Sequence, residues 1–123
     1  MATTAEFSSG QRTFQATAAA IPNGARVKVD SARQISVAAA TDAHIGVTTE
    51  YVAASGYGSV KLFSSQGTFL MLASTAITCG TQVYPAASGK IAATGTTALN
   101  IVALEAAGAD GDLIECAIIQ KGA

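Results

Sequence analysis

The stretch AITCGTQVYPAASGKI, residues Ala76–Ile91, decides the fold because an earlier stretch of the chain follows the same pattern. The earlier copy is AIPNGARVKVDSARQI, residues Ala20–Ile35. Four anchor positions recur at an offset of 56 residues (77 − 21 = 56), and a fifth pair ten residues further on keeps that register. The pairs are Ile21/Ile77, Gly24/Gly80, Val27/Val83, Ile35/Ile91 and Ile45/Ile101. We infer two consecutive copies of one unit, at about residues 11–63 and 68–119.

Each copy alternates apolar and polar residues as half-buried strands do. In residues 25–30, two valines alternate with Arg26, Lys28 and Asp30, which places the charged residues on the exposed face. Turn-forming residues recur about every 8–12 positions, the spacing of a small sandwich or barrel. The sequence therefore predicts an all-β protein, a compact β-barrel or sandwich of roughly ten strands built from two pseudo-repeated halves.

The chain is long enough for one domain, since domains cluster at about 100–150 residues. We expect residues 11–123 to form that domain, with the two halves closed around a shared interior and Phe69 in the position of Phe14. Residues 1–10 are small and polar without periodicity, which predicts an extended, flexible N-terminal arm. Phe7, the arm's aromatic residue, is either an anchor for a partner's groove or a cover for the edge of its own domain.

Charged residues are sparse, at 12% against about 25% in an ordinary domain. The net charge is −1, and the basic residues are scattered apart from Arg26, Lys28 and Arg33. Nucleic-acid binding needs clustered Lys and Arg to neutralise phosphates, so we expect no nucleic-acid partner. Low charge combined with 27 alanines is typical of a surface that lies against other protein.

The sequence also predicts the compartment. No run approaches the roughly 20 apolar residues of a membrane span, and MATTAEFSSGQR at the start lacks the pattern of a signal peptide. We therefore expect a soluble protein that folds in the cytosol, with no membrane partner. Cys79 and Cys116 form no CxxC pair, and we expect both to be small buried side chains in a reducing compartment.

Motifs of catalysis are missing: the sequence has no phosphate-binding glycine loop, zinc-protease helix or nucleophile elbow. His44 is the single histidine, with Asp42 nearby but no nucleophile motif. We interpret it as a loop-end residue that donates a hydrogen bond, and we expect no enzyme activity.

Two further groups are candidates for a metal or a cofactor. Glu105, Asp110, Asp112 and Glu115 could supply oxygen ligands to Ca²⁺, but their spacing fits no EF-hand loop, and a polar turn explains them better. Lys90 follows a predicted hairpin tip, where lipoyl and biotinyl carrier domains place their modified lysine, yet its flanking residues differ from theirs. We expect neither a metal nor a cofactor.

Three segments resemble the capsid cement (head decoration) proteins of tailed phages. GTQVYPAASGKI at Gly80–Ile91 resembles that family's G-x-x-V-Y-P-A-A-x-G-K-V/I segment, and Ile45–Val47 resembles its IGV strand. LEAAGADGDLIE at Leu104–Glu115 resembles its closing ALEAAsADGDlIEV segment. The likeness covers about residues 11–119.

The resemblance implies a β-rich protein, made in the host cytoplasm, that binds the outer surface of an icosahedral head and clamps neighbouring major capsid subunits. Such proteins often form homotrimers. We hypothesise that residues 1–12 add a strand to a capsid sheet edge, with Phe7 as the anchor and Arg12 paired to a capsid carboxylate. Phe14 is the third candidate contact. The alternative is a β-barrel binding or carrier module, either carbohydrate-binding or lipoyl-like.

Overall fold

The computed structural model describes residues 10–119, and this part of the chain contains strands, turns and one 3₁₀ turn but no α-helix. The prediction of an all-β fold is confirmed. The elements are β1 (Gln11–Ala16), β2 (Arg26–Val29), β3 (Gln34–Val37), β4 (Gly46–Thr48), β5 (Tyr57–Leu62), β6 (Phe69–Leu72), β7 (Tyr84–Pro85), η1 (Ala87–Gly89), β8 (Ile91–Ala92), β9 (Ile101–Ala103) and β10 (Leu113–Ile118).

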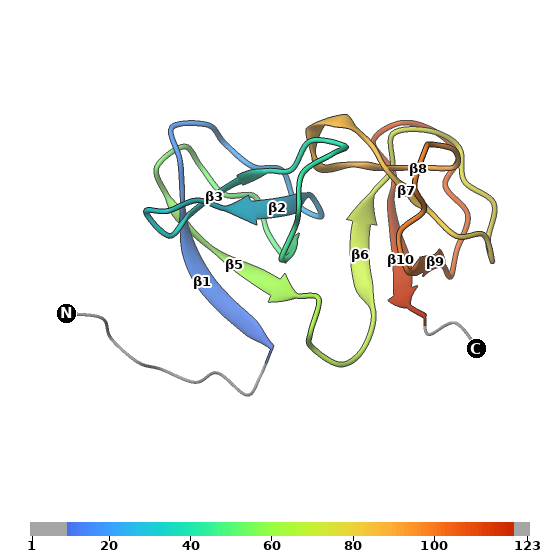
Figure 1. The fold of residues 1–123 in the computed structure, drawn as a ribbon, viewed down its shortest axis with the longest axis horizontal. Helices are drawn as coiled ribbons and strands as arrows, with labels where there is room; N and C mark the ends of the chain where they lie inside the picture. The colour runs from blue at the N-terminus through green and yellow to red at the C-terminus, as the bar shows by residue number, and fades with distance from the viewer. Residues whose placement is uncertain (1–9, 120–123) are drawn as a thin grey trace.

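The first half closes into a five-stranded barrel in the order β1-β3-β2-β4-β5. β1 closes it, because it pairs antiparallel with β5 and parallel with β3. The second half consists of a three-stranded sheet, β6-β10-β9, and the pair β7-β8. The two halves lie side by side and are joined by the turn between β5 and β6 (Figure 1).

The two halves repeat the same backbone hydrogen bonds. Ile21 and Val52 exchange two N–H···O bonds of 2.8 Å, and Ile77 and Ala107 exchange two bonds of 3.0 and 2.9 Å. Strands β5 and β10 also begin and end 56 residues apart (57 + 56 = 113 and 62 + 56 = 118). The anchor Ile21 therefore makes the same pairing as the anchor Ile77.

The strand pairing corrects one expected match between the halves. Arg12 lies opposite Val60 in the first half, and Phe69 lies opposite Cys116 in the second. Since Val60 and Cys116 are 56 residues apart (116 − 60 = 56), Phe69 occupies the position of Arg12. The expectation that Phe69 replaces Phe14 is wrong, because backbone pairing and not aromatic character sets the register.

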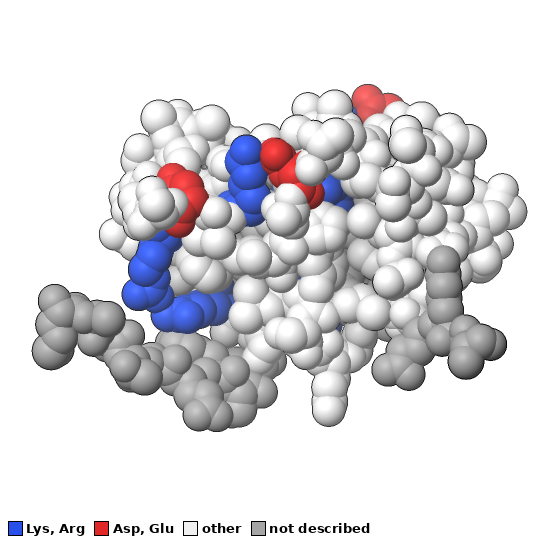
Figure 2. Space-filling view, viewed as in Figure 1, with Lys and Arg blue, Asp and Glu red and all other residues white. Residues whose placement is uncertain are grey.

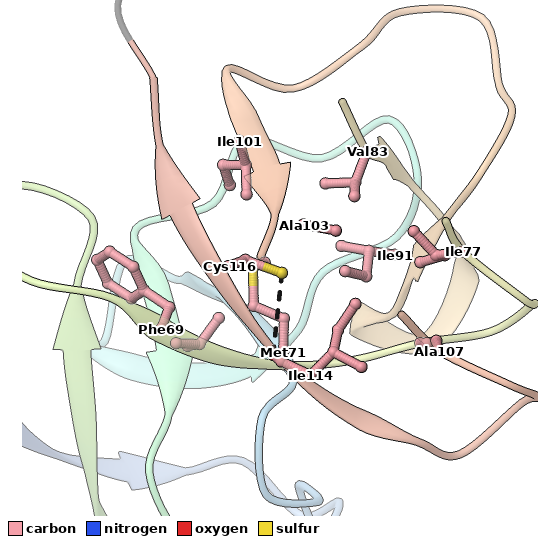
Figure 3. Close-up of a cluster of buried hydrophobic side chains, with 12 residues drawn as sticks. Phe69, Met71, Ile77, Val83, Ile91, Ile101, Ala103, Ala107, Ile114 and Cys116 are labelled. Atoms are coloured by element: carbon pink, nitrogen blue, oxygen red, sulfur yellow. Dashed lines mark hydrogen bonds between the residues drawn. The ribbon is translucent and has the colours of Figure 1, made fainter. Parts of the chain in front are cut away.

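The expectation of one shared interior is also wrong, because each half has its own apolar core. The barrel closes on itself and leaves no open face to share. Only Val47 and the partly buried Phe63 extend from the first half into the second core. The first core contains Ala16, Ile21, Ala25, Val27, Ile35, Val52 and Val60. Figure 3 shows the second, with Phe69, Met71, Ile77, Val83, Ile91, Ile101, Ala103, Ala107, Ile114 and Cys116.

The backbones of the two halves approach each other closely at Gly89, at the end of η1. Its N–H donates a 2.8 Å hydrogen bond to the carbonyl of Ala38 in the first half. A Cβ atom at Gly89 would lie 2.8 Å from the carbonyl oxygen of Arg26, and the residue has a left-handed φ of +72°. Gly80 also has a left-handed φ, +88°, but a Cβ there would meet nothing within 4 Å.

We expect Gly89→Ala to lower the free energy of unfolding more than Gly80→Ala. Both substitutions cost about 1–2 kcal/mol of left-handed strain. Gly89→Ala also forces the two halves apart, which adds about 1–3 kcal/mol. Urea denaturation of both variants measures the difference. Equal losses would show that the halves do not depend on this close approach.

Candidate functional site

Arg26 of β2 lies at the joint between the two halves and is completely buried. Its Nη2 donates to the carbonyl of Ala86 (2.7 Å) and its Nε to the carbonyl of Lys90 (3.1 Å), both in the second half. The alternation in residues 25–30 predicted an exposed side chain at this position. That prediction is wrong for Arg26, because the second half covers the outer face of the barrel there.

His44 accepts the third hydrogen bond of Arg26. The distance from Arg26 Nη1 to His44 Nδ1 is 2.9 Å, and since a guanidinium can only donate, Nδ1 carries no proton. Burial and the adjacent charge of Arg26 lower the pKa of His44. The expected hydrogen bond at the end of a loop is present, but His44 accepts it instead of donating. Its ring also packs on Phe63, with the centroids 4.8 Å apart.

Asp42 supplies negative charge beside this pair. Its carboxylate accepts a 2.9 Å bond from the N–H of Ala39 and pairs with Lys28 at 2.9 Å. These contacts lower the pKa of Asp42, the Ala39 bond most strongly. Burial lowers the pKa of Arg26, and the charge of Asp42 partly opposes that effect.

A groove of about 820 Å³ lies over this joint. Its walls are the loop 40–44 from the first half and Pro85 with residues 95–99 from the second. A second hollow of about 390 Å³ shares His44 and Leu99 with it and extends to Phe63 and Ile118. The lining is mostly alanine, threonine and leucine, which suits a protein contact better than a charged ligand.

Two of the sequence-predicted contact residues, Arg12 and Phe14, do not line this groove. Phe7 is outside the described residues. Arg12 and Phe14 both belong to β1 and are partly buried, and the Arg12 guanidinium carbon lies 5.7 Å from the centroid of the Phe14 ring. The structure therefore brings Arg12 and Phe14 together at the end of the barrel where the chain enters.

Gln11 and Arg12, the last two residues of the segment that the sequence predicted to pair with a capsid sheet edge, belong to β1. They pair with Lys61 and Val60 of β5. β3 pairs with β1 only at residues 15 and 16, so among the described residues no strand pairs with the second edge of β1 over residues 11–14. An unpaired edge of this kind can accept a further strand.

The candidate metal ligands make local hydrogen bonds. Asp112 accepts the N–H groups of Gly108 and Ala109, Glu105 accepts that of Glu115, and Glu115 accepts the hydroxyl of Thr68. Within residues 10–119, no group of three or more potential ligands could hold a metal ion. These contacts agree with the polar-turn interpretation.

Lys90 and the two cysteines make contacts within the fold. Lys90 Nζ forms a 2.7 Å ion pair with Asp110, the fourth residue of the acidic group. Cys116 is buried, and burial raises the pKa of its thiol to about 12. The expectation of two buried cysteines is wrong for Cys79, which is exposed and donates to the carbonyl of Leu104, because it lies in a turn and not in a strand.

Charge is distributed unevenly between the halves. Residues 11–63 carry five basic and three acidic side chains, a net +2, and residues 68–119 carry one basic and four acidic, a net −3. On the face in Figure 2, most charged atoms lie over the barrel half, and the other half is almost uncharged. Within residues 10–119, no helix has the length and apolarity to cross a membrane.

The arrangement defines an all-β protein built from two similar halves, with a closed barrel in the first. A solved structure with a similar fold is the N base of head fiber gp8.5 of bacteriophage phi29. The TM-score is 0.71 at 18% sequence identity, and the match covers 89% of this chain and 94% of that one. The sequence matches no protein-family model, and no curated protein matches it.

We expect Arg26→Met to lower the free energy of unfolding by about 3 kcal/mol. The variant leaves the carbonyls of Ala86 and Lys90 without their charged donor, and bonds to charged groups contribute about 1.5–3 kcal/mol each. Arg33→Met, at an exposed turn, is the matched control and should change stability by less than about 0.5 kcal/mol. Similar losses in chemical denaturation would contradict a special role for Arg26.

We also expect stability to fall as the pH drops below about 6.5, the ordinary pKa of histidine. The pKa of His44 is lower in the folded protein, so the unfolded state binds the proton more readily and acidification favours unfolding. The loss continues until the pH passes below the folded pKa.

His44→Gln isolates this effect, because the chain has one histidine and a glutamine oxygen still accepts from Arg26. Thermal melts between pH 7.5 and about 5.5, above the carboxylate range, should show a decline for the natural chain and a flat profile for the variant. Parallel profiles of melting temperature against pH for the two proteins would contradict the assignment of His44 as the titrating group.

Proposed function

We propose that this chain is a non-enzymatic structural protein of a tailed-phage head, which binds the outer surface of the shell and clamps neighbouring major capsid subunits. The observation that carries the proposal is the fold it shares with a phage head fiber base over nearly the whole of both chains. The resemblance of Gly80–Ile91 and Leu104–Glu115 to cement proteins supports the same reading from the sequence. The protein would be made in the host cytoplasm and reside on the virion.

The N-terminal end of the barrel is the proposed contact with the major capsid protein. Residues 1–10 would pair with a capsid sheet edge through main-chain hydrogen bonds, with Phe7 as the anchor. The unpaired edge of β1 over residues 11–14 could continue this pairing. Arg12 and Phe14 lie together at the base of the arm, where Arg12 would meet a capsid carboxylate.

Self-association into a homotrimer is part of the proposal. The first core consists largely of alanine and valine, and half of the buried residues of the second core are alanine, valine or cysteine; each such residue buries little apolar area. Binding to the shell and to further copies would add stability by mass action. Clamping follows, since a bound oligomer holds several capsid subunits at once.

The alternative of a carrier or sugar-binding module has less support. Lys90 is held in an ion pair with Asp110, whereas a carrier lysine must be free for modification. Among the tyrosines, Tyr84 is partly buried, and Tyr51 and Tyr57 are exposed on the other half. Intact-mass measurement of the chain purified from infected cells would reveal a modified Lys90 and overturn our preference.

The proposal predicts that the purified chain sediments with undecorated heads of the phage that encodes it. Binding should raise the temperature at which the heads release their DNA. A chain that stays in the supernatant at all concentrations and salt conditions would rule out the function.

The arm is tested in the same assay with residues 2–9 deleted. This deletion leaves β1 intact, so the variant should fold as before but lose most of its binding. Arg33→Glu, far along the chain from the arm, serves as a surface control and should bind normally. Full binding by the deletion variant would exclude the arm while leaving head attachment in place.

A further inference from the structure

The loop 39–44, which supplies one wall of the groove, is tied to strand β2 at both ends. The N–H of Ala38, just before the loop, donates to the carbonyl of Arg26 at 2.9 Å. The N–H of Ile45, just after the loop, donates to the carbonyl of Val27 at 3.0 Å. Most of the loop between these two bonds is exposed. The fixed ends therefore confine any movement to the loop itself and leave the barrel unchanged.

Two side chains hold the middle of this loop in place. Asp42 accepts the N–H of Ala39 and pairs with Lys28, both at 2.9 Å. The Asp42–Lys28 pair is partly exposed, and ion pairs of that kind contribute little stability. His44 connects the loop to the buried joint, because its Nδ1 accepts a 2.9 Å hydrogen bond from Arg26. The position of the loop therefore depends mainly on His44.

Protonation removes the hydrogen bond between His44 and Arg26. A neutral imidazole can accept at Nδ1, but an imidazolium carries an N–H on both ring nitrogens and accepts in no orientation. The N–H of Nδ1 would then point at the N–H of Nη1 across 2.9 Å. The two groups would also both be positively charged, and charges in a buried site are screened far less than charges at the surface.

Arg26 cannot move away from this repulsion, so His44 must. The guanidinium is completely buried, donates to the carbonyls of Ala86 and Lys90, and does not lose its proton in proteins. The charge of Lys90 itself is neutralised by an ion pair with Asp110. The ring of His44, by contrast, is only partly buried and lines the groove. Solvent can hydrate the imidazolium once the loop turns outward.

The charged groups around His44 do not oppose this movement. Arg26 and Lys28 approach from β2, and Phe63, on which the ring packs, is uncharged. Among the described residues that line the groove and the second hollow, the ionisable side chains are those of Asp42 and His44. The N–H of the loop and Lys28 lower the pKa of Asp42, so its carboxylate stays ionised and paired with Lys28 while His44 titrates.

We propose that the loop 39–44 is a pH-operated wall of the groove: protonation of His44 releases the loop from Arg26 and opens the groove, and deprotonation closes it. Burial and the charge of Arg26 lower the pKa of His44 in the closed position. The closed position is therefore favoured above the ordinary histidine pKa of about 6.5 and loses this advantage as the pH falls toward the lowered value. The device belongs to this chain alone and operates whether or not the chain binds a phage head.

The test follows the full chain by NMR between pH 7.5 and about 5, above the range in which carboxylates titrate. At neutral pH the rings of His44 and Phe63, with centroids 4.8 Å apart, should give nuclear Overhauser contacts. In acid these contacts should disappear, and the amides of the loop 39–44 should relax as those of a flexible chain do. The amides of Ile21 and Ile77, one in each half, should keep their shifts, because both halves stay folded.

Three outcomes of this titration would overturn the proposal. The first is a protonated His44 that keeps its ring contacts with Phe63. The second is a loop that stays ordered down to the lowest pH. The third is loss of the signals of Ile21 and Ile77 together with those of the loop, which would show unfolding of the whole chain in place of a local opening.

Two variants separate the charge of His44 from its contact. His44→Gln keeps an acceptor for Arg26 and cannot titrate, so its loop should stay ordered over the whole pH range. His44→Lys places a permanent positive charge beside Arg26, so its loop should be flexible already at neutral pH. A His44→Gln loop that opens in acid, or a His44→Lys loop that is ordered at neutral pH, would overturn the proposal.

Discussion

The buried guanidinium of Arg26 fixes how the two halves lie against each other. Arginine stays charged in proteins, so its burial is tolerated only where its donors find acceptors. The carbonyls of Ala86 and Lys90 and the ring of His44 provide them, at 2.7 to 3.1 Å. Most apolar residues belong to one core or the other, so this polar joint, together with the close approach at Gly89, sets the relative position of the halves.

The same joint orders the loop that forms one wall of the groove. Asp42 and His44 both belong to this loop, and each has a contact that ties it to the barrel or to Arg26. The ionised Asp42 offsets part of the unfavourable burial of Arg26, and Lys28 holds Asp42 in place. These contacts hold the walls of the groove at a fixed spacing. A partner protein that binds there would meet a preformed surface and would not have to order the loop on binding.

The repeat allowed the sequence to predict the fold class and its anchors, because Ile21 and Ile77 make identical backbone bonds in their halves. The separate cores were not predictable, since a pattern of apolar residues shows which side chains are buried and not which of them meet. Arg26 was placed on the wrong face for the same reason. Strand alternation describes one sheet, and what covers the outside of that sheet is decided by residues 60 positions further along the chain.

Differences between the halves carry information that their similarities do not. Positions 26 and 82 are equivalent, yet Gln82 bonds the carbonyl of Leu99 within its own half, whereas Arg26 extends into the other half. Both copies form the same backbone hydrogen bonds, so a residue type found at equivalent positions of both halves is one that the fold itself requires. Where equivalent positions of the two halves carry different residues, the difference reflects what each half contacts. On that criterion Arg26 belongs to the joint between the halves.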